Sequence, residues 1–311
     1  MAVSYLPIHF ITKFYSPVIV DNPPLFVLRS VLGKELRSMC CVAHKSKCQE
    51  CMYNKTCAYA FLFETILPQE NNVVPGRDRA SHPFAFTQGR GDVGKAVNDF
   101  DFEITLFGKA IDYLPYIYAA FVRAGKKGLF KERIPFTVQR VIANQKDILI
   151  SSEQLDTSVS PLIYEDFASD EQSNSSVKNG EILVELKSPL RFKVNGKYTS
   201  NFSARDFMSC LFRRMNTMCS LYGQTDSSQD NNFSANENIQ ITDRNLHWNQ
   251  NSHYSARQKN AMELGGVTGT FKLYGSFTEQ DLRLFEFAKI SNAGKNTNFG
   301  LGQLDFWTKW E

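Results

Sequence analysis

One unit of sequence occurs twice in this chain, and this internal repeat limits the possible folds more than any other feature. The first copy runs from residues 106–108 (Leu-Phe-Gly) through a helical pattern to residues 124–126 (Ala-Gly-Lys), and then through a basic loop into a strand. The second copy has the same order, from residues 273–275 (Leu-Tyr-Gly) to residues 293–295 (Ala-Gly-Lys) and a last strand. A strand, a helix and a strand in this order are typical of the closing half of a ferredoxin-like unit.

The opening half of such a unit also occurs twice. Residues 3–12 alternate like a strand, and residues 25–39 then carry apolar side chains at helical spacing. Residues 181–192 again have a strand-like pattern, and Ser203 with Asp206 forms a capping-box pattern at the start of a second helix. The sequence therefore predicts an α+β protein with two tandem ferredoxin-like domains.

The length of 311 residues fits two domains of average size. Residues 151–180 are rich in Ser, Asp, Glu and Asn and lack periodicity, which is typical of a linker or an insertion. We therefore expect a first domain at residues 1–150, with a Cys-rich insertion, and a second domain at residues 181–311, with a Gly-rich loop.

The composition is that of an ordinary globular protein, with 42% hydrophobic and 22% charged residues. The net charge of +3 permits an anionic partner, but a strongly basic surface must come from local clustering. The start of the chain lacks the basic and apolar regions of a signal peptide, and no apolar run is long enough for a membrane span. We expect a cytoplasmic protein with reduced thiols and no membrane partner.

Five of the seven cysteines lie in one short segment: Cys40, Cys41, Cys48, Cys51 and Cys57. A Cys-x-x-Cys pair with a flanking cysteine on each side is typical of structural zinc, and an iron–sulfur cluster would need the same ligands. The alternative is a set of reduced, partly buried thiols in a loop. We predict a structural metal at Cys48, Cys51 and Cys57 with Cys41, or alternatively Cys40, as the fourth ligand, followed by a strand in the apolar run of residues 58–66.

The second copy of the repeat contains a loop, residues 294–302, with three glycines and one lysine. Glycine lets a backbone approach another chain closely, and exposed N–H groups in such a turn can form a concave site for phosphate. The simpler interpretation is a tight turn between a helix and a strand. Only the repeat around the loop favours a binding site over a simple turn.

Several further motifs are shared with one known family. They are residues 28–33 (LRSVLG), 57–59 (CAY), 82–84 (HPF), 212–214 (FRR), 254–258 (YSARQ), 264–266 (LGG) and 294–302 (GKNTNFGLG). With these motifs the sequence resembles, over nearly its whole length, the Cas-six group of CRISPR-associated endoribonucleases in the RAMP superfamily. Asn292 stands where members often carry glycine, and asparagine tolerates left-handed conformations.

The resemblance implies an endoribonuclease that cleaves precursor CRISPR RNA within its repeats without a metal ion. A ribose 2′-OH attacks the adjacent phosphate, which leaves a 2′,3′-cyclic phosphate and a 5′-OH. This reaction needs a base and an acid, for which histidine is suited, and a cation that stabilises the phosphorane. The implied partners are the precursor CRISPR RNA repeat and other CRISPR effector subunits, while a homodimer is left open.

His44 is the first catalytic candidate, because the family generally places its catalytic histidine after the first helix. The alternative is that His44 is a metal ligand or an ordinary loop residue. Lys47 is a weaker candidate for charge stabilisation and Tyr59 for positioning, and His253 is the reserve catalytic candidate. We expect His82, which precedes a proline and an apolar strand, to be structural.

The expected RNA-binding residues lie in the Gly-rich loop and in two basic motifs. They are Gly294, Lys295, Asn296, Asn298, Gly300 and Gly302 in the loop, Arg257 and Lys259 before the Gly-Gly strand, and Arg213 and Arg214 in the second-domain helix. The alternative for the arginine pair is a solvated helix face. Basic residues also mark the matching loop of the first domain: Lys126, Lys127, Lys131 and Arg133.

Three other functions fit parts of the pattern. A non-catalytic RAMP subunit that holds CRISPR RNA in an effector complex would have the same fold and glycine loops. A zinc-stabilised RNA-binding regulator would explain the cysteines, and a metal-dependent nuclease would need clustered carboxylates that the sequence does not suggest. His44 and the whole-chain resemblance favour the metal-independent nuclease.

Overall fold

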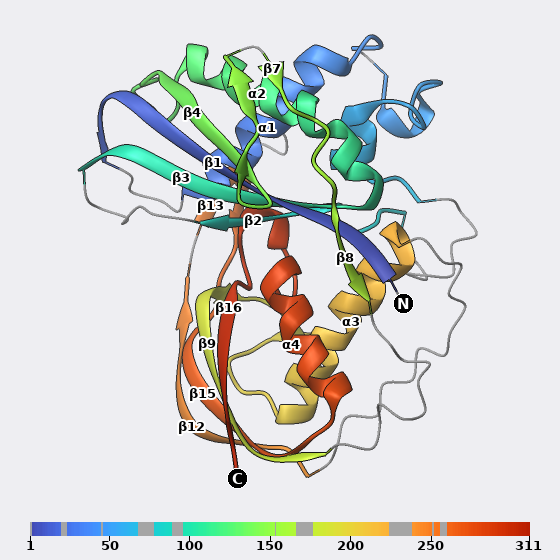
Figure 1. Cartoon of the computed structure of the whole chain (residues 1–311), viewed down its shortest axis with the longest axis vertical. Coiled ribbons are helices and arrows are strands. Elements are labelled where there is room, and N and C mark those ends of the chain that lie inside the picture. The colour runs from blue at the N-terminus through green and yellow to red at the C-terminus, as the bar shows by residue number, and fades with distance from the viewer. Residues whose placement is uncertain are drawn as a thin grey trace. The chain divides into compact units, whose positions relative to one another are not determined.

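The computed structural model describes residues 2–19, 24–44, 46–67, 78–88, 96–152, 154–165, 177–223, 238–250, 252–255 and 260–311. The chain divides into two compact units, an N-terminal unit at Ser4–Ile163 and a C-terminal unit at Tyr164–Glu311, with which the first three residues group. Figure 1 shows that each unit contains a sheet covered by helices.

The N-terminal unit has the β-α-β-β-α-β order of a ferredoxin-like fold. Its main elements are β1 (Ala2–Ile19), α1 (Pro24–Cys40), β2 (Phe84–Gln88), β3 (Ala96–Phe107), α2 (Leu114–Lys127), β4 (Phe136–Ala143) and β5 (Lys146–Asp147). The strand order is β2-β3-β1-β4-β5, and β1 is antiparallel to both β3 and β4. Helices α1 and α2 lie on the same face of this sheet (Figure 1).

The C-terminal unit repeats this topology. Its main elements are β9 (Lys178–Leu190), α3 (Ala204–Tyr222), β12 (Gln240–Asn249), β15 (Gly266–Phe277), α4 (Glu279–Ser291) and β16 (Leu304–Trp310). The strand order β12-β15-β9-β16 corresponds to β2-β3-β1-β4 of the N-terminal unit. Helices α3 and α4 again share one face of the sheet (Figure 1). The prediction of two tandem ferredoxin-like domains is confirmed.

Smaller elements connect these parts. They are 3₁₀ helices at Cys48–Glu50, Gly108–Tyr113 and Thr297–Phe299, a π-helix at Ala60–Glu64, and strands β6 (Leu149–Ser151), β7 (Gln154–Leu155), β8 (Leu162–Glu165), β10 (Lys193–Val194), β11 (Lys197–Tyr198), β13 (Ser252–Ser255) and β14 (Asn260–Glu263). The expected linker at residues 151–180 contains β7 and β8, and its residues 166–176 lie outside the described ones. No helix in the described ranges is long and apolar enough to cross a membrane.

Capping boxes fix the start of both helices in the C-terminal unit. The Ser203 hydroxyl accepts the N–H of Asp206, whose carboxylate accepts the N–H of Ser203. Thr278 and Asp281 make the same reciprocal pair at the start of α4. Each cap satisfies two N–H groups that the helix leaves open, which is worth about 1 kcal/mol. This local chemistry explains why both helix starts are predictable from the sequence.

Residues 58–64 of the run are helical and only Ile66 forms a β-bridge, with Arg79, so the strand predicted at residues 58–66 is wrong. The helical residues form a turn that widens into the π-helix at Ala60–Glu64, and the N–H of Thr65 donates to the carbonyl of Ala60. Tyr59 and Phe63 lie one turn apart, and their rings stack with centroids 5.7 Å apart. A short apolar run does not distinguish a buried strand from a buried helix, which is the reason for the error.

Candidate functional site

The loop after α1 presents His44 to solvent. The N–H of Cys41 still donates to the carbonyl of Arg37, so the last turn of the helix reaches this point, and a turn follows in which Ser46 donates to the carbonyl of Ala43. The His44 side chain on this turn is exposed. This placement leaves the imidazole accessible to a ligand, as a catalytic residue requires.

Lys47 lies on the same loop and is also exposed. Its side chain is 80% exposed and makes an ion pair of 3.8 Å with Glu50. An exposed pair of this kind contributes little to stability, so the ammonium can exchange Glu50 for another anion at low cost. Lys47 is therefore accessible to another anion, and its charge-stabilising role stays a prediction.

The five clustered cysteines line one small cavity beside this loop. Cys40, Cys41, Cys48, Cys51 and Cys57 all contribute to its wall, together with Ser46, Tyr53 and Asn54, and its volume is about 20 Å³. All five thiols are reduced and half-buried. Burial raises the pKa of Cys40 and Cys48, and in both cases the neighbouring Cys57 raises it further. Within the described ranges, no three Cys, His, Asp or Glu side chains already have a metal-binding arrangement.

Tyr59 is inside the N-terminal unit and does not face a ligand. It is 5% exposed, and its hydroxyl donates to a Glu64 oxygen at 3.1 Å. Glu64 is itself buried and pairs with Arg79 at 2.7 Å. The Arg37 guanidinium lies over the Tyr59 ring at 5.8 Å. The expected positioning role of Tyr59 at the phosphate is therefore corrected: the residue supports the wall of the cysteine cavity.

Several backbone N–H groups of the Gly-rich loop have partners inside the protein. They donate within the protein: Ala293 to Gly302, Lys295 to Arg191, Phe299 to Asn296, Gly300 to Thr297, and Gly302 to Pro189. These bonds are 2.8 to 3.1 Å long. These four loop N–H groups, of Lys295, Phe299, Gly300 and Gly302, are therefore not available to phosphate, and phosphate binding by the rest of the loop stays a prediction.

Within the Gly-rich loop, exposure separates the predicted RNA-binding residues. Asn298, Gly300 and Gly302 are buried, Gly294 and Asn296 are half-buried, and Lys295 is exposed. Gly302 has φ +77°, and a Cβ there would collide with the carbonyl oxygen of Ala293, so the tight turn itself requires glycine. Lys295 is the member of the loop that remains available to an anionic ligand.

Arg214 of α3 binds the end of α4, where the loop begins. It is 6% exposed, and its Nη2 donates to the carbonyl oxygen of Ser291, the last residue of α4, at 2.9 Å. Burial lowers the pKa of its guanidinium to about 10, so it stays charged at neutral pH, where a cation stabilises the negative end of a helix. The expected phosphate contact of Arg214 is therefore wrong, and so is the alternative that Arg214 lies on a solvated face of the helix. The adjacent Arg213 is exposed on α3.

Asn292 opens the loop as the sequence suggests. It follows the last residue of α4 and has φ +56° and ψ 162°, a combination that glycine adopts far more readily than any other residue. Its position is fully buried. The backbone is therefore not in the left-handed α conformation that asparagine tolerates, and the turn keeps asparagine where glycine would be less strained.

Three candidates before the Gly-Gly strand have no described side chain. Arg257 and Lys259 lie outside the described residues. His253 belongs to β13, where its backbone pairs with Met262 of β14. The structure therefore places the backbone of His253 in a hairpin of the C-terminal unit, while His44 and Lys47 belong to the N-terminal unit.

Arg191 is a supporting residue that no sequence motif reveals. Its carbonyl accepts the N–H of Lys295, and its guanidinium donates to the carbonyls of Glu263 and Gly265 at 2.8 and 3.0 Å. The same guanidinium lies 4.0 Å above the ring of Tyr198. Arg191 thus joins the Gly-rich loop to the start of β15, and its hydrogen-bond partners Glu263, Gly265 and Lys295 are all distant in sequence.

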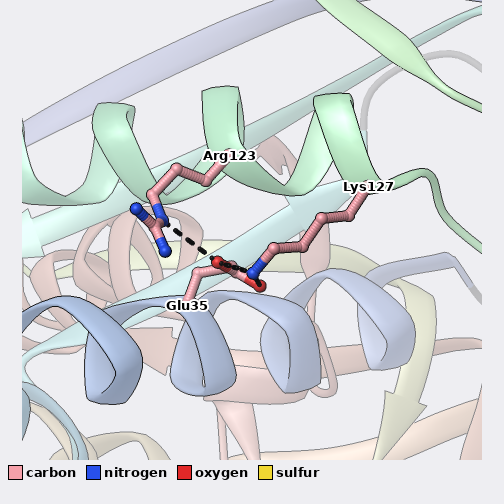
Figure 2. A network of polar contacts seen from close by, with 3 residues as sticks. All are labelled: Glu35, Arg123 and Lys127. Carbon is pink, nitrogen blue, oxygen red and sulfur yellow. Dashed lines mark hydrogen bonds and ion pairs between the residues drawn. The ribbon is translucent and has the colours of Figure 1, made fainter.

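Lys127 in the first copy of the repeat is bound internally. Lys127 and Arg123 of α2 both contact the carboxylate of Glu35 on α1, at 2.7 and 3.3 Å (Figure 2). Glu35 is 2% exposed, whereas the side chains of both cations are about half exposed. This cluster joins the two helices of the N-terminal unit, so Lys127 is not part of a free basic surface.

Comparisons with known proteins assign both halves of the chain. Residues 3–162 match the model of an N-terminal domain, AF_1859_N, and residues 184–304 match the model of the CRISPR-associated endoribonuclease Cas6. No curated protein matches the sequence significantly.

Solved structures with the same fold span the whole chain. Cas6 of Thermus thermophilus is 14% identical with a TM-score of 0.50, and the match covers 99% of this chain and 100% of that one. A Cas6 product complex has the same identity and TM-score, with 97% and 99% covered. A partial Cas6-RT-Cas1–Cas2 complex contains a chain 13% identical, with a TM-score of 0.51, 99% of this chain and 46% of that chain covered. At such identities these likenesses establish the fold alone.

The two tandem ferredoxin-like units define the fold of the chain. Within it, residues 184–304 of the C-terminal unit match the domain of the CRISPR-associated endoribonuclease Cas6, and residues 3–162 match the N-terminal domain AF_1859_N.

Proposed function

We propose that this protein cleaves precursor CRISPR RNA within its repeats by a reaction that needs no metal ion. The observation that carries the proposal is the exposed His44, on the loop directly after α1, in a chain whose residues 184–304 match the Cas6 model. Histidine is the side chain most often used for general acid–base catalysis.

The reaction is an internal transesterification. The 2′-oxygen loses its proton to a base and forms a bond to the adjacent phosphorus, and the bond from phosphorus to the 5′-oxygen breaks. The leaving oxygen takes a proton, so the products are a 2′,3′-cyclic phosphate and a 5′-OH. His44 supplies the proton-transferring group and Lys47 stabilises the charge on the phosphorane, while His253 is the reserve candidate in place of His44.

Binding of the RNA is assigned to the exposed cations of the C-terminal unit. Lys295 is exposed on the Gly-rich loop and Arg213 on α3, and both can contact phosphate without losing an internal partner that the structure shows. Arg257 and Lys259 stay in the proposal on sequence grounds. Each phosphate contact releases counterions, so binding must weaken as the salt concentration rises.

Protein partners are proposed from the solved structures of similar fold. One of them is a Cas6 product complex, and others are Cas6-RT-Cas1–Cas2 complexes. We extend from these to an RNA product that stays bound and to contacts with other CRISPR proteins. A non-catalytic RAMP subunit is the competing function, and it would bind the repeat without cutting it.

One cleavage experiment tests the proposal. Purified protein is incubated with a labelled repeat RNA in EDTA, and the ends of any product are identified by mass spectrometry. The proposal predicts one discrete cut, a cyclic phosphate and a 5′-OH. Binding without a cut would support the non-catalytic subunit, and a cut only after Mg²⁺ is added would contradict the metal-independent reaction.

A further inference from the structure

The segment between α1 and the π-helix is folded without a hydrophobic core of its own. Among its described residues from Cys41 to Cys57, none is buried, and its apolar Val42 and Met52 are 71% and 84% exposed. The backbone nevertheless makes a series of tight turns. Small folded segments without a core usually depend on a covalent or metal cross-link.

Those turns bring the cysteines toward each other. The N–H of Cys51 donates to the carbonyl of Cys48 at 3.3 Å across a 3₁₀ turn, a geometry in which side chains three residues apart lie on the same side. The N–H of Cys57 donates to the carbonyl of Tyr53 at 2.9 Å, so the chain returns before the π-helix begins. Cys41 follows α1 directly, and all of these cysteines line the same cavity.

We propose that this cavity is a structural zinc site with Cys41, Cys48, Cys51 and Cys57 as ligands. Four thiolates are a complete tetrahedral set for Zn²⁺, at Zn–S distances of about 2.3 Å. The cavity volume of about 20 Å³ has room for one small occupant, which fits a single ion better than an iron–sulfur cluster.

Metal binding completes the site. Within the described residues the cysteines share the cavity without already having ligand geometry. The half-buried thiols must move inward and lose their protons as the ion binds. Such coupling of binding to local folding is usual for small zinc sites.

The ion would also position the proposed catalytic residue. Cys41 and Cys48 flank the turn that carries His44 and Lys47, so two ligands close this short loop on both sides. Closing the loop removes conformations of His44 that do not suit proton transfer. This second step depends on the proposed cleavage function, whereas the zinc site itself does not.

Metal content is the first test. The full chain, purified without chelator, should contain about one zinc ion per chain. The double variant Cys48→Ser/Cys51→Ser should lose it, and the control Cys219→Ser, which changes a buried thiol of α3 in the C-terminal unit, should keep it. Zinc below about half an equivalent with no uptake of added Zn²⁺ or Co²⁺, or iron in place of zinc, would overturn the proposal.

The ligand set is tested with Co²⁺ in place of zinc. The intense visible absorption of a tetrahedral thiolate site should persist in Cys40→Ser and disappear in Cys41→Ser. The reverse result would overturn the assignment of Cys41. Because this spectrum is read without RNA, a protein that fails to cleave RNA would still test the zinc site.

The positioning of His44 by the ion is tested by two measurements on the double variant Cys48→Ser/Cys51→Ser. Trypsin should cut faster after Lys47 and Lys55 when the zinc is absent, and the single-turnover cleavage rate should fall about 10- to 100-fold with unchanged repeat binding. Equal trypsin protection in both forms would overturn the ordering role of the ion. Faster trypsin cleavage with an unchanged RNA cleavage rate would overturn the positioning of His44 alone.

Discussion

The two copies of the Ala-Gly-Lys motif have the same sequence but different structures. In the N-terminal unit, residues 124–126 lie inside α2, which continues to Lys127. In the C-terminal unit, α4 ends at Ser291, and residues 293–295 lie in the Gly-rich loop that follows. The first copy therefore contributes to helix packing, and the second exposes a lysine at the surface.

The different helix ends have identifiable causes. Asn292 leaves the helical conformation with φ +56°, Arg214 satisfies the carbonyl of Ser291, and Arg191 accepts the N–H of Lys295. In the first copy α2 continues to Lys127, which pairs with the buried Glu35, and ends at Gly128, which has φ +79°. Similar local sequence thus leads to different ends because the partners come from other elements.

Gly302→Ala should cause the largest loss of stability and would break the turn of the second copy. Gly302 has φ +77° and touches the Ala293 backbone, so we expect the free energy of unfolding to fall by about 3 kcal/mol or more. The control is Gly196→Ala, which has φ +78° and nothing within 4 Å of an added Cβ, and should cost about 1 kcal/mol. Urea unfolding measures both, and equal losses would contradict the proposed backbone collision.

Glu35→Gln should have a smaller effect, confined to the first copy. It weakens the contacts to Lys127 and Arg123, and because both cations are half exposed we expect a loss of about 1–3 kcal/mol, below that of a fully buried pair. Glu279→Gln removes a charge from the more exposed pair with Arg283 on α4 and should cost less than about 0.5 kcal/mol. Equal losses of unfolding free energy for the two variants in urea would mean that the burial of Glu35 does not strengthen its ion pairs.

Lys295→Ala should change RNA binding and leave stability nearly unchanged. We expect weaker repeat binding and a salt dependence of log K whose slope is smaller by about 0.7 for one lost contact to a single strand. Lys127→Ala should lower the free energy of unfolding and leave repeat binding and its salt slope nearly unchanged, because this lysine pairs with Glu35. Filter binding at several salt concentrations measures the slope, and an equal change in slope for both variants would contradict the distinction between the two copies.

Much of the fold is predictable because its signals are local. The capping boxes at Ser203 and Thr278 and the repeated strand–helix–strand order depend on residues close in sequence. The helix at residues 58–64 is missed because its stacked Tyr59 and Phe63 fit a strand pattern equally well until their packing is known. Local chemistry therefore sets which elements form, while packing decides the ambiguous ones.

The site is less predictable because its bonds are not local. Lys295 and Arg191 are partners across more than one hundred positions, and nothing near either residue signals the bond. For the same reason, the sequence does not reveal that Arg214 is buried while Arg213 is exposed. Exposure of His44, in contrast, follows from its place in a polar loop after a helix.

The most direct test compares cutting and binding in His44→Ala. The account predicts that the single-turnover cleavage rate of a repeat RNA falls by about 100-fold or more, while the dissociation constant of the repeat stays unchanged. His247→Ala, which removes another exposed histidine on β12, is the matched control and should cleave normally. Unchanged cleavage by His44→Ala would contradict the account and transfer the catalytic role to His253.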